Sequence, residues 1–332
     1  MTTKPTRNDP AVAPEFRKDP LDERFLEHLN DCLAPHERAL HVEPGELDER
    51  WPTIHVIGPP RSGTTLATQL IAAHLDVGCI NNLVAAFWAA PVHGIRLAKR
   101  LLPIPAPSTY ESRYGRTQTI SEPHEFGYFW ASLLGYRDMV EPTPEQIADV
   151  DWDRVRATLL NMNEAYGRPT LFKSFMAAFY LPGLLRALQR TCLVRMRRAP
   201  VDNALSVLGM RREYASDPSV WVSLRPREYA WLKSESLPRQ AAGQVVFTHA
   251  AIDRGLAQVE HPHMLDVDYE QMCADPAGFL ARVQSMLARA GAVVELVRPA
   301  PAPFELRRTA PNDDAELAEL EAALAEFSAP RF

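Results

Sequence analysis

Cysteine is scarce in this sequence, and its four cysteines lie far from one another. Cys32, Cys79, Cys192 and Cys273 have neither the close spacing of a zinc site nor the paired spacing of a redox motif. Such isolated cysteines are typical of free thiols in a reducing compartment. We therefore expect no disulfide framework, and no motif in the chain requires a metal ion.

Long apolar runs and an excess of positive charge are also absent. No run reaches the ~18 apolar residues that suggest a membrane-spanning helix. The amino terminus, Met-Thr-Thr-Lys-Pro-Thr-Arg, has no apolar segment of the kind found in signal peptides. These absences predict a soluble, cytoplasmic protein without a transmembrane segment. The formal net charge of −6 argues against a general nucleic-acid or anionic-membrane surface, although a local basic pocket is compatible with it.

The overall composition is that of a globular protein. Of the 332 residues, 46% are hydrophobic and 23% are charged, which allows a sizeable core. Residues 1–20 are rich in proline, threonine and charge, and we expect them to form a mobile arm. No internal repeat or long low-complexity linker follows. The remaining residues, 21–332, are therefore predicted to form a single domain.

The most informative segment is Thr53-Ile-His-Val-Ile-Gly-Pro-Pro-Arg-Ser-Gly-Thr-Thr-Leu66. Residues 53–57 are β-rich, whereas Leu66, Leu70 and later leucines recur at helical spacing, with glycines and prolines between the two patterns. A strand, a tight loop and the start of a helix are therefore predicted. Such a loop directs backbone N–H groups toward one point, and the positive end of the helix dipole favours an anion there.

The same loop argues against an ordinary triphosphate site. Residues 58–65 have the spacing of a P-loop, but Thr64 stands where nucleotide triphosphatases carry lysine. Arg61 instead places a permanently charged, planar guanidinium within the loop, and this group suits phosphate or sulfate oxygens. The alternative is a turn that needs its glycines only for its backbone geometry.

Strand and helix patterns alternate along the chain, which predicts an α/β fold with a parallel sheet flanked by helices. Strands are predicted at 53–57, 77–80, 170–172, 191–196 and 263–267, and helices at 21–33, 84–102, 151–166, 181–188, 200–212, 276–290 and 313–327. Pro35 is expected to stop the first helix. Residues 221–258 have no clear period and are not assigned. In such folds ligands bind beyond the carboxyl ends of the strands, where the loop, Lys173 and Arg198 all lie.

Arg198 and Ser206 form a second candidate anion site. Arg198 follows a predicted strand, and Ser206 lies eight positions later on the succeeding helix. A guanidinium and a hydroxyl so placed can bind one anionic group outside the sheet. The alternative is a solvated basic strand end followed by an ordinary helical serine.

Together these two elements resemble those of sulfotransferases that use 3′-phosphoadenosine 5′-phosphosulfate (PAPS). Pro60-Arg61-Ser62-Gly63-Thr64-Thr65 resembles their phosphosulfate-binding loop, and Arg198-Ala-Pro to Ser206 resembles their 3′-phosphate element. The resemblance covers residues 53–212, with a fainter match in 267–272. It implies a P-loop-like sulfotransferase fold and transfer of a sulfuryl group from PAPS to a hydroxyl or amine. The cofactor-binding residues it implies are Arg61, Ser62, Gly63, Thr64, Thr65, Arg198 and Ser206.

The resemblance also implies catalytic residues. Lys173, in Leu171-Phe-Lys-Ser174, looks like the family's lysine beside the transferred group; the alternative is a lysine whose stem lies along the strand end. Many cytosolic sulfotransferases carry a catalytic histidine two residues later, where this chain has Phe175. Others carry a glutamate shortly after the loop helix, but residues 79–83 contain no carboxylate.

The remaining candidates for a base are Glu122, His124 and Glu125. Pro123-His-Glu125 looks like the Pro-x-Glu element of bacterial sulfotransferase-like sequences, so we favour Glu125, then His124, then Glu122. The alternative is an acidic helix start with Pro123 in its first turn.

The acceptor is indicated only in outline. The aromatic residues at 126 and 128–130 suggest an apolar or aromatic pocket beside the base, although closely spaced aromatics also form ordinary core. Because the net charge disfavours a polyanionic acceptor, a small molecule or a lipid alcohol is expected. Two other functions remain open: a nucleotide kinase or NTPase with Leu265-Asp-Val-Asp268 as a metal-binding segment, and a non-catalytic nucleotide-binding protein.

Overall fold

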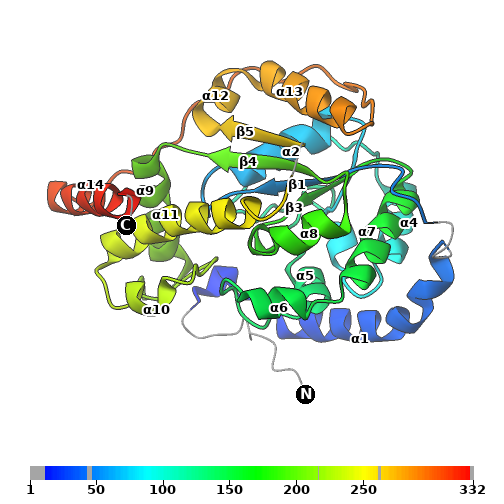
Figure 1. Cartoon of the computed structure of the whole chain (residues 1–332), viewed down its shortest axis with the longest axis horizontal. Helices are drawn as coiled ribbons and strands as arrows, with labels where there is room; N and C mark the ends of the chain where they lie inside the picture. Colours follow the sequence, from blue (N-terminus) through cyan, green and yellow to red (C-terminus); the bar gives the residue numbers. More distant parts are fainter. Residues whose placement is uncertain (1–11, 43–46, 216, 261–262, 330–332) are drawn as a thin grey trace.

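The computed structural model describes residues 12–42, 47–215, 217–260 and 263–329 (Figure 1). The predicted mobile arm lies partly outside these ranges, because residues 1–11 are not described. Residues 12–20 contain the 3-10 helix η1 (Pro14–Phe16), and of this segment Val12 and Phe16 are buried, at 9% and 3% exposure. Val12 forms an isolated antiparallel bridge with Ala215.

The predicted parallel sheet is confirmed. Within the described residues it has five strands in the order β2-β3-β1-β4-β5, and all neighbouring pairs are parallel. The strands are β1 (Thr53–Ile57), β2 (Gly78–Cys79), β3 (Thr170–Lys173), β4 (Cys192–Arg197) and β5 (Met264–Asp268). All five residues of β1 are buried, as expected for a central parallel strand with helices over both faces.

Helices cover both faces of the sheet (Figure 1). On one face lie α2 (Thr64–His74), α12 (Tyr269–Ala274) and α13 (Pro276–Arg289), which pack on Ile54 and Val56 of β1. The other face packs against α7 (Trp152–Tyr166), α8 (Leu181–Ala187) and α11 (Leu237–Leu256). His55 faces this second layer and stacks on Phe172 at 5.1 Å between ring centroids. Burial lowers the pKa of His55 to about 3, so its imidazole is neutral at physiological pH.

The remaining elements extend this α/β core. They are α1 (Pro20–Glu37), η2 (Arg38–Leu40), α3 (Asn82–Ala85), α4 (Pro91–Leu101), α5 (Gly127–Leu134), α6 (Pro144–Ala148), η4 (Met176–Phe179), α9 (Pro200–Tyr214), α10 (Tyr229–Leu232) and α14 (Asp314–Ser328). Helices α9, α10, α11 and α14 share a separate apolar cluster. No helix in the described ranges is both long enough and apolar enough to cross a membrane.

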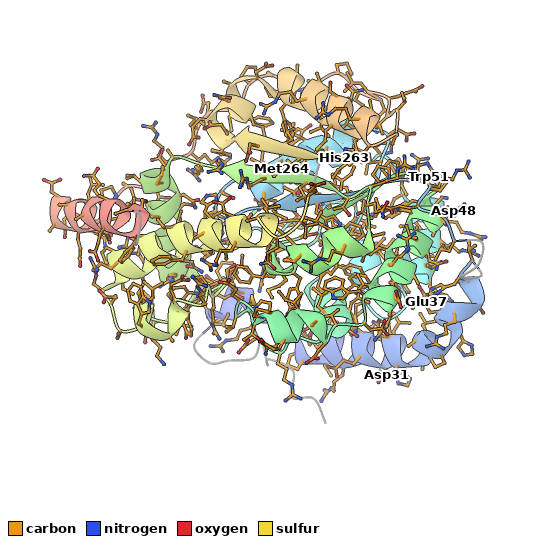
Figure 2. All side chains as sticks on the ribbon, viewed as in Figure 1. Asp31, Glu37, Asp48, Trp51, His263 and Met264 are labelled. Atoms are coloured by element: carbon orange, nitrogen blue, oxygen red, sulfur yellow. The ribbon has the colours of Figure 1, made fainter. Side chains whose placement is uncertain are left out.

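Two predicted helices differ from the observed ones. The helix α1 continues past Pro35 and ends at Glu37 (Figure 2). The Glu37 carboxylate accepts hydrogen bonds from the Val92 amide and from His93 Nδ1, both at 2.6 Å, which anchor this last turn. The single helix predicted over residues 84–102 is wrong: α3 ends at Ala85, and α4 begins at Pro91. Proline has no N–H to continue an existing helix but suits the first turn of a new one.

Candidate active site

The strand order places the candidate phosphate loop between its two predicted partners. Because β1 lies between β3 and β4, the loop after Ile57 lies beside Lys173 at the end of β3 and Arg198 just after β4. Residues separated by more than a hundred positions in sequence therefore meet at one sheet edge. This edge, beyond the carboxyl ends of the strands, is where parallel α/β sheets bind their ligands.

The loop after β1 is held in shape by hydrogen bonds to its own backbone carbonyls. Ser62 Oγ donates to the Pro59 carbonyl at 2.8 Å, and Asn203 Nδ2 on α9 donates to the Pro60 carbonyl at 2.7 Å. Gly63 has φ +98° and immediately precedes α2, and a Cβ at this position would lie 2.3 Å from the ring of Tyr269. Only glycine fits there, because both the backbone conformation and the close ring exclude a side chain.

The two predicted phosphate elements are in contact with each other. Arg61 Nε donates to Ser206 Oγ at 3.1 Å, and Arg198 Nη1 donates to the Arg61 carbonyl at 3.1 Å. The Arg198 guanidinium lies 4.8 Å from the ring centroid of Tyr269. Thr64 and Thr65 form the first turn of α2, so their backbone amides belong to the same helix N-terminus.

This arrangement brings the positive charges of two arginines together. Burial lowers the pKa of Arg61 from its usual value, and the charge of Arg198 lowers it further. Within the described part of the chain, the buried Nε of Arg198 has no hydrogen-bond partner. Two neighbouring guanidiniums, an unused donor and a helix N-terminus are together suited to a ligand with phosphate or sulfate groups.

Lys173 and Glu125 meet beside this cluster. Lys173 Nζ lies 2.9 Å from Glu125 Oε1 and donates to the Gly115 carbonyl, also at 2.9 Å. The lysine side chain is 2% exposed, whereas that of Glu125 is 36% exposed. A Cβ at Gly115 would lie 3.1 Å from Nζ, 3.3 Å from Glu125 Oε1 and 3.7 Å from Thr65 Oγ1. The ammonium, the carboxylate and a helix N-terminal hydroxyl therefore converge around one small space.

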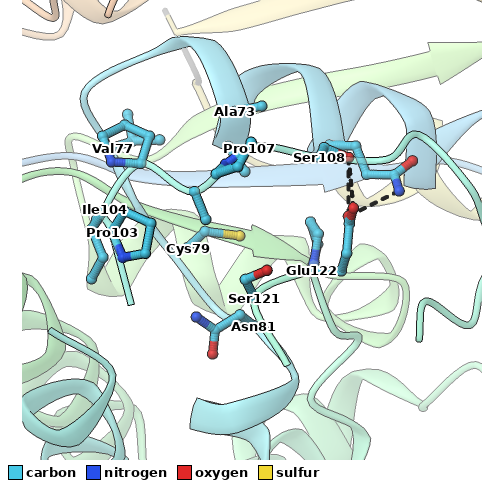
Figure 3. Close-up of a pocket in the computed structure, with 15 residues that line it drawn as sticks. Ala73, Val77, Cys79, Asn81, Pro103, Ile104, Pro107, Ser108, Ser121 and Glu122 are labelled. Carbon is cyan, nitrogen blue, oxygen red and sulfur yellow. Dashed lines mark hydrogen bonds between the residues drawn. The ribbon is translucent and has the colours of Figure 1, made fainter. Parts of the chain in front are cut away.

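The other two base candidates are placed differently. His124 Nδ1 accepts a hydrogen bond from the Phe126 amide at 2.8 Å, so the neutral imidazole carries its proton on Nε2. The single basic lone pair of this ring, on Nδ1, is therefore already used by the hydrogen bond. Glu122 is 2% exposed and lies beside the segment that contains Ser108 (Figure 3). Of the three candidates, Glu125 is the one that pairs with Lys173 in the described part of the chain.

Glu122 has the environment of a structural carboxylate. It accepts hydrogen bonds from Gln69 Nε2 at 3.0 Å, Ser108 Oγ at 2.8 Å and the Thr109 amide at 2.7 Å. We expect Glu122→Ala to lower the free energy of unfolding by about 3 kcal/mol, because the buried Gln69 amide and the partly buried donors of Ser108 and Thr109 lose their charged acceptor. Denaturant unfolding measures this loss, and Glu111→Ala, at an exposed position, is the matched control. A loss no greater than that of the control would contradict the structural role.

The aromatic segment after Glu125 is mostly core. Phe126 and Phe129 stack at 4.3 Å between centroids, and both are at most 3% exposed, as is Trp130. Tyr128 differs, because it lies against Trp88 at 4.9 Å and the Lys18 ammonium at 4.2 Å. Of the four aromatic residues predicted to form the pocket, Tyr128 therefore remains a candidate for contact with an acceptor, with Trp88 beside it.

Two cavities lie away from this cluster. One, of about 20 Å³, is lined by Cys79, Ser121 and Glu122 among others and holds roughly one water molecule (Figure 3). The other, of about 800 Å³, is lined by Glu49 and Arg190, which precede β1 and β4 and so lie at the opposite edge of the sheet. Neither cavity is lined by Lys173, Glu125 or Arg61, so we identify the candidate active site from its converging side chains and not from a cavity.

Sequence reasoning missed the turn that covers the cluster. Arg113 and Arg116 exchange two backbone hydrogen bonds, of 2.9 and 3.0 Å, around Tyr114 and Gly115. Both central residues have positive φ, +51° and +85°, which is the geometry of a type I′ turn. The Tyr-Gly pair was the available signal, but a tyrosine in the left-handed region is too uncommon to be expected from sequence.

Comparisons with known proteins bear on the family and the fold of the chain. A family model described as "Sulfotransferase family" matches residues 52–290. Among solved structures, the sulfotransferase STF1 from Mycobacterium tuberculosis H37Rv is similar, with 15% identity, a TM-score of 0.52, and coverage of 85% of this chain and 79% of that one. The sulfotransferase STF9 from Mycobacterium avium shares 12% identity, with a TM-score of 0.51 and coverage of 98% and 81%. No curated protein matches the sequence. The predicted P-loop-like sulfotransferase fold is thus confirmed.

Proposed function

The chain belongs to the sulfotransferase family, and from this premise we propose that it transfers the sulfuryl group of PAPS to a hydroxyl or amine of a small-molecule or lipid acceptor. The observation that carries the proposal is the contact between the loop after β1 and the Arg198–Ser206 element, with Lys173 and Glu125 beside them. This edge offers places for two separate anionic groups of one ligand and, next to them, an acid–base pair.

PAPS carries anionic groups at its 5′ and 3′ positions, and the residues present suit both. The loop and first turn of α2 (Arg61, Ser62, Gly63, Thr64 and Thr65) would hold the 5′-phosphosulfate through backbone amides, hydroxyls and one guanidinium. Arg198 and Ser206 would hold the 3′-phosphate, and the unpartnered Nε of Arg198 supports this assignment.

In the proposed reaction an S–O bond forms from the acceptor oxygen to sulfur, and the bond from sulfur to the 5′-phosphate oxygen breaks. Lys173 stabilises the negative charge that develops on the leaving oxygen. Glu125 receives the proton of the acceptor hydroxyl, since its carboxylate is partly exposed and lies 2.9 Å from Lys173. The products are the sulfated acceptor and 3′-phosphoadenosine 5′-phosphate (PAP). As in phosphoryl transfer, the protein acts mainly by positioning and charge stabilisation.

The kinase or NTPase alternative is less compatible with the contacts of β5. Asp266, one of the two carboxylates of the segment 265–268, accepts hydrogen bonds from Arg195 at 2.9 Å and from Arg197 at 3.3 Å. Asp268 caps α12 by accepting from the Gln271 amide at 3.1 Å. Both carboxylates are therefore occupied within the protein, and the loop lysine that an NTPase requires is replaced by Thr64.

A binding experiment tests the donor assignment. We expect PAP to bind at least roughly tenfold more tightly than adenosine 5′-phosphate, because a second phosphate adds at least one charge-assisted hydrogen bond worth about 1.5 kcal/mol or more. Arg198→Ala should abolish most of this ratio while leaving the affinity for adenosine 5′-phosphate nearly unchanged. Isothermal titration calorimetry measures all four affinities.

The matched control is Arg197→Ala, at the neighbouring exposed arginine that pairs with Asp266. Binding of ATP with Mg²⁺ but not of PAP would contradict the donor assignment and favour the kinase alternative.

If PAP binds, mass spectrometry of a library of alcohols, phenols and amines incubated with PAPS then identifies the acceptor class. Binding of PAP without transfer to any acceptor would favour the non-catalytic alternative.

A further inference from the structure

The Arg113–Arg116 turn touches two of the three cations of the proposed site, Lys173 and Arg61. The Gly115 carbonyl accepts the hydrogen bond from Lys173 at 2.9 Å, and the ring of Tyr114 lies 5.1 Å from the Arg61 guanidinium. The glycine leaves the space beside Lys173, Glu125 and Thr65 open. The position of this turn therefore affects where these cations point.

The turn is held from outside by the segment that precedes α1. Phe16 lies against the Arg113 guanidinium at 4.7 Å and stacks on Tyr214 at 4.9 Å, and its ring centroid is 6.0 Å from that of Tyr114. Arg116 ties the same groups together, because it donates to the Phe16 carbonyl at 2.8 Å and to Tyr214 Oη at 3.0 Å.

Two further contacts anchor this segment. The Ala13 amide donates to the Tyr214 carbonyl at the end of α9, at 2.9 Å. The Arg113 guanidinium lies between Glu15 and Glu213, at 3.6 and 3.5 Å. Phe16 itself is 3% exposed, so its ring fills a site that α9, the turn and residues 12–17 build together.

We propose that Phe16 is a positioning residue for sulfuryl transfer: it fixes the Arg113–Arg116 turn, and the turn orients Lys173. The inference rests on the proposed function. Lys173 has three N–H donors; within the described residues, Glu125 and the Gly115 carbonyl account for two, and the third can point to the transferred group. If the turn shifts, the lysine loses one of the two contacts that set this direction.

Phe16→Ala is expected to lower kcat by roughly tenfold or more, since small displacements of reacting groups cost rate steeply. The KM for PAPS and the affinity for PAP should change less than kcat, because Arg61, which Tyr114 of the turn contacts, is also held by Ser206 of α9. Phe16→Leu should restore most of kcat by refilling the site. Phe25→Ala, at a 64% exposed phenylalanine of α1, is the matched control and should leave kcat unchanged.

A second readout does not depend on activity. Limited trypsin digestion followed by mass spectrometry should show faster cleavage after Arg113 in Phe16→Ala than in the wild type or in Phe25→Ala. Arg116→Met loosens the same turn without altering Phe16, and should reproduce both the lower kcat and the faster cleavage even if Phe16→Ala fails to fold.

These readouts separate the two proposals. If the wild type neither binds PAP nor transfers a sulfuryl group, the proposed function fails, whereas the trypsin comparison still reports on the turn. If the wild type is active and Phe16→Ala and Arg116→Met both match Phe25→Ala in kcat and cleavage, Phe16 has no positioning role. A higher kcat in either variant would mean that the turn obstructs the site, and would also overturn the inference.

Discussion

Lys173→Met is expected to lower kcat by roughly 10²–10³-fold, the loss typical of removing one preorganised donor to a developing negative charge. The lysine is 2% exposed and held by Glu125 and the Gly115 carbonyl, so its charge is fixed in place before the donor binds. Methionine keeps a similar length and volume but supplies neither charge nor donor. Steady-state kinetics with PAPS and an acceptor from the library screen measure the effect.

The comparison between kcat and the affinity for PAP is as informative as the size of the loss in kcat. Because the phosphate groups are assigned to Arg61 and Arg198, the affinity of Lys173→Met for PAP should fall much less than kcat. Lys233→Met, at an exposed lysine just after α10, is the matched control. An unchanged kcat, or an equal loss of kcat and PAP affinity, would show that Lys173 does not act on the leaving oxygen.

The sheet could be predicted from sequence because its strands are short apolar runs followed by turn residues and helices. The strand prediction at 53–57 matches β1, and those at 170–172 and 191–196 match β3 and β4 to within one residue at each end. Once these strands are parallel neighbours, the positions of Lys173 and Arg198 beside the loop follow from topology alone.

Helix α11 was missed for a specific physical reason. It buries Gln240, Gln244 and Thr248 along with its apolar residues, so hydrophobic periodicity does not reveal its buried face. The two glutamine oxygens accept hydrogen bonds from the fully buried Arg211 of α9, both at 2.8 Å. Burial lowers the pKa of Arg211 to about 10, and the guanidinium also lies 4.3 Å from the ring of Trp221. Such a polar network depends on tertiary structure that a sequence pattern does not contain.

Only some residues of the candidate site could be placed from the sequence. Residues fixed by a strand end or by the loop motif, such as Arg61 and Lys173, could be placed from sequence. The choice among Glu122, His124 and Glu125 could not be made from sequence, because these neighbours have different surroundings. Glu122 contacts the donors around Ser108, His124 contacts the Phe126 amide, and Glu125 contacts Lys173. Phe16 and the Arg113–Arg116 turn required the tertiary structure altogether.

Glu125→Gln is expected to lower kcat by roughly 10²–10⁴-fold with an aliphatic alcohol as acceptor, the range typical of a general base. An alcohol gives up its proton only as the bond to sulfur forms, so the reaction needs a base at that point. Glutamine keeps the shape of the side chain but does not take up a proton. The variant should still bind PAP, since no phosphate contact is assigned to Glu125.

The acidity of the acceptor separates this role from a general disturbance of Lys173, the partner of Glu125. With a phenol that is already ionised at the assay pH, no proton has to be removed, so Glu125→Gln should lose far less activity than with an alcohol. A disturbance of Lys173 would lower kcat with both acceptors to a similar extent. His124→Gln is the comparison variant and should show no such dependence on the acceptor. An equal loss of kcat with both acceptors in Glu125→Gln would rule out Glu125 as the base, and a dependence found only in His124→Gln would assign the proton to the histidine.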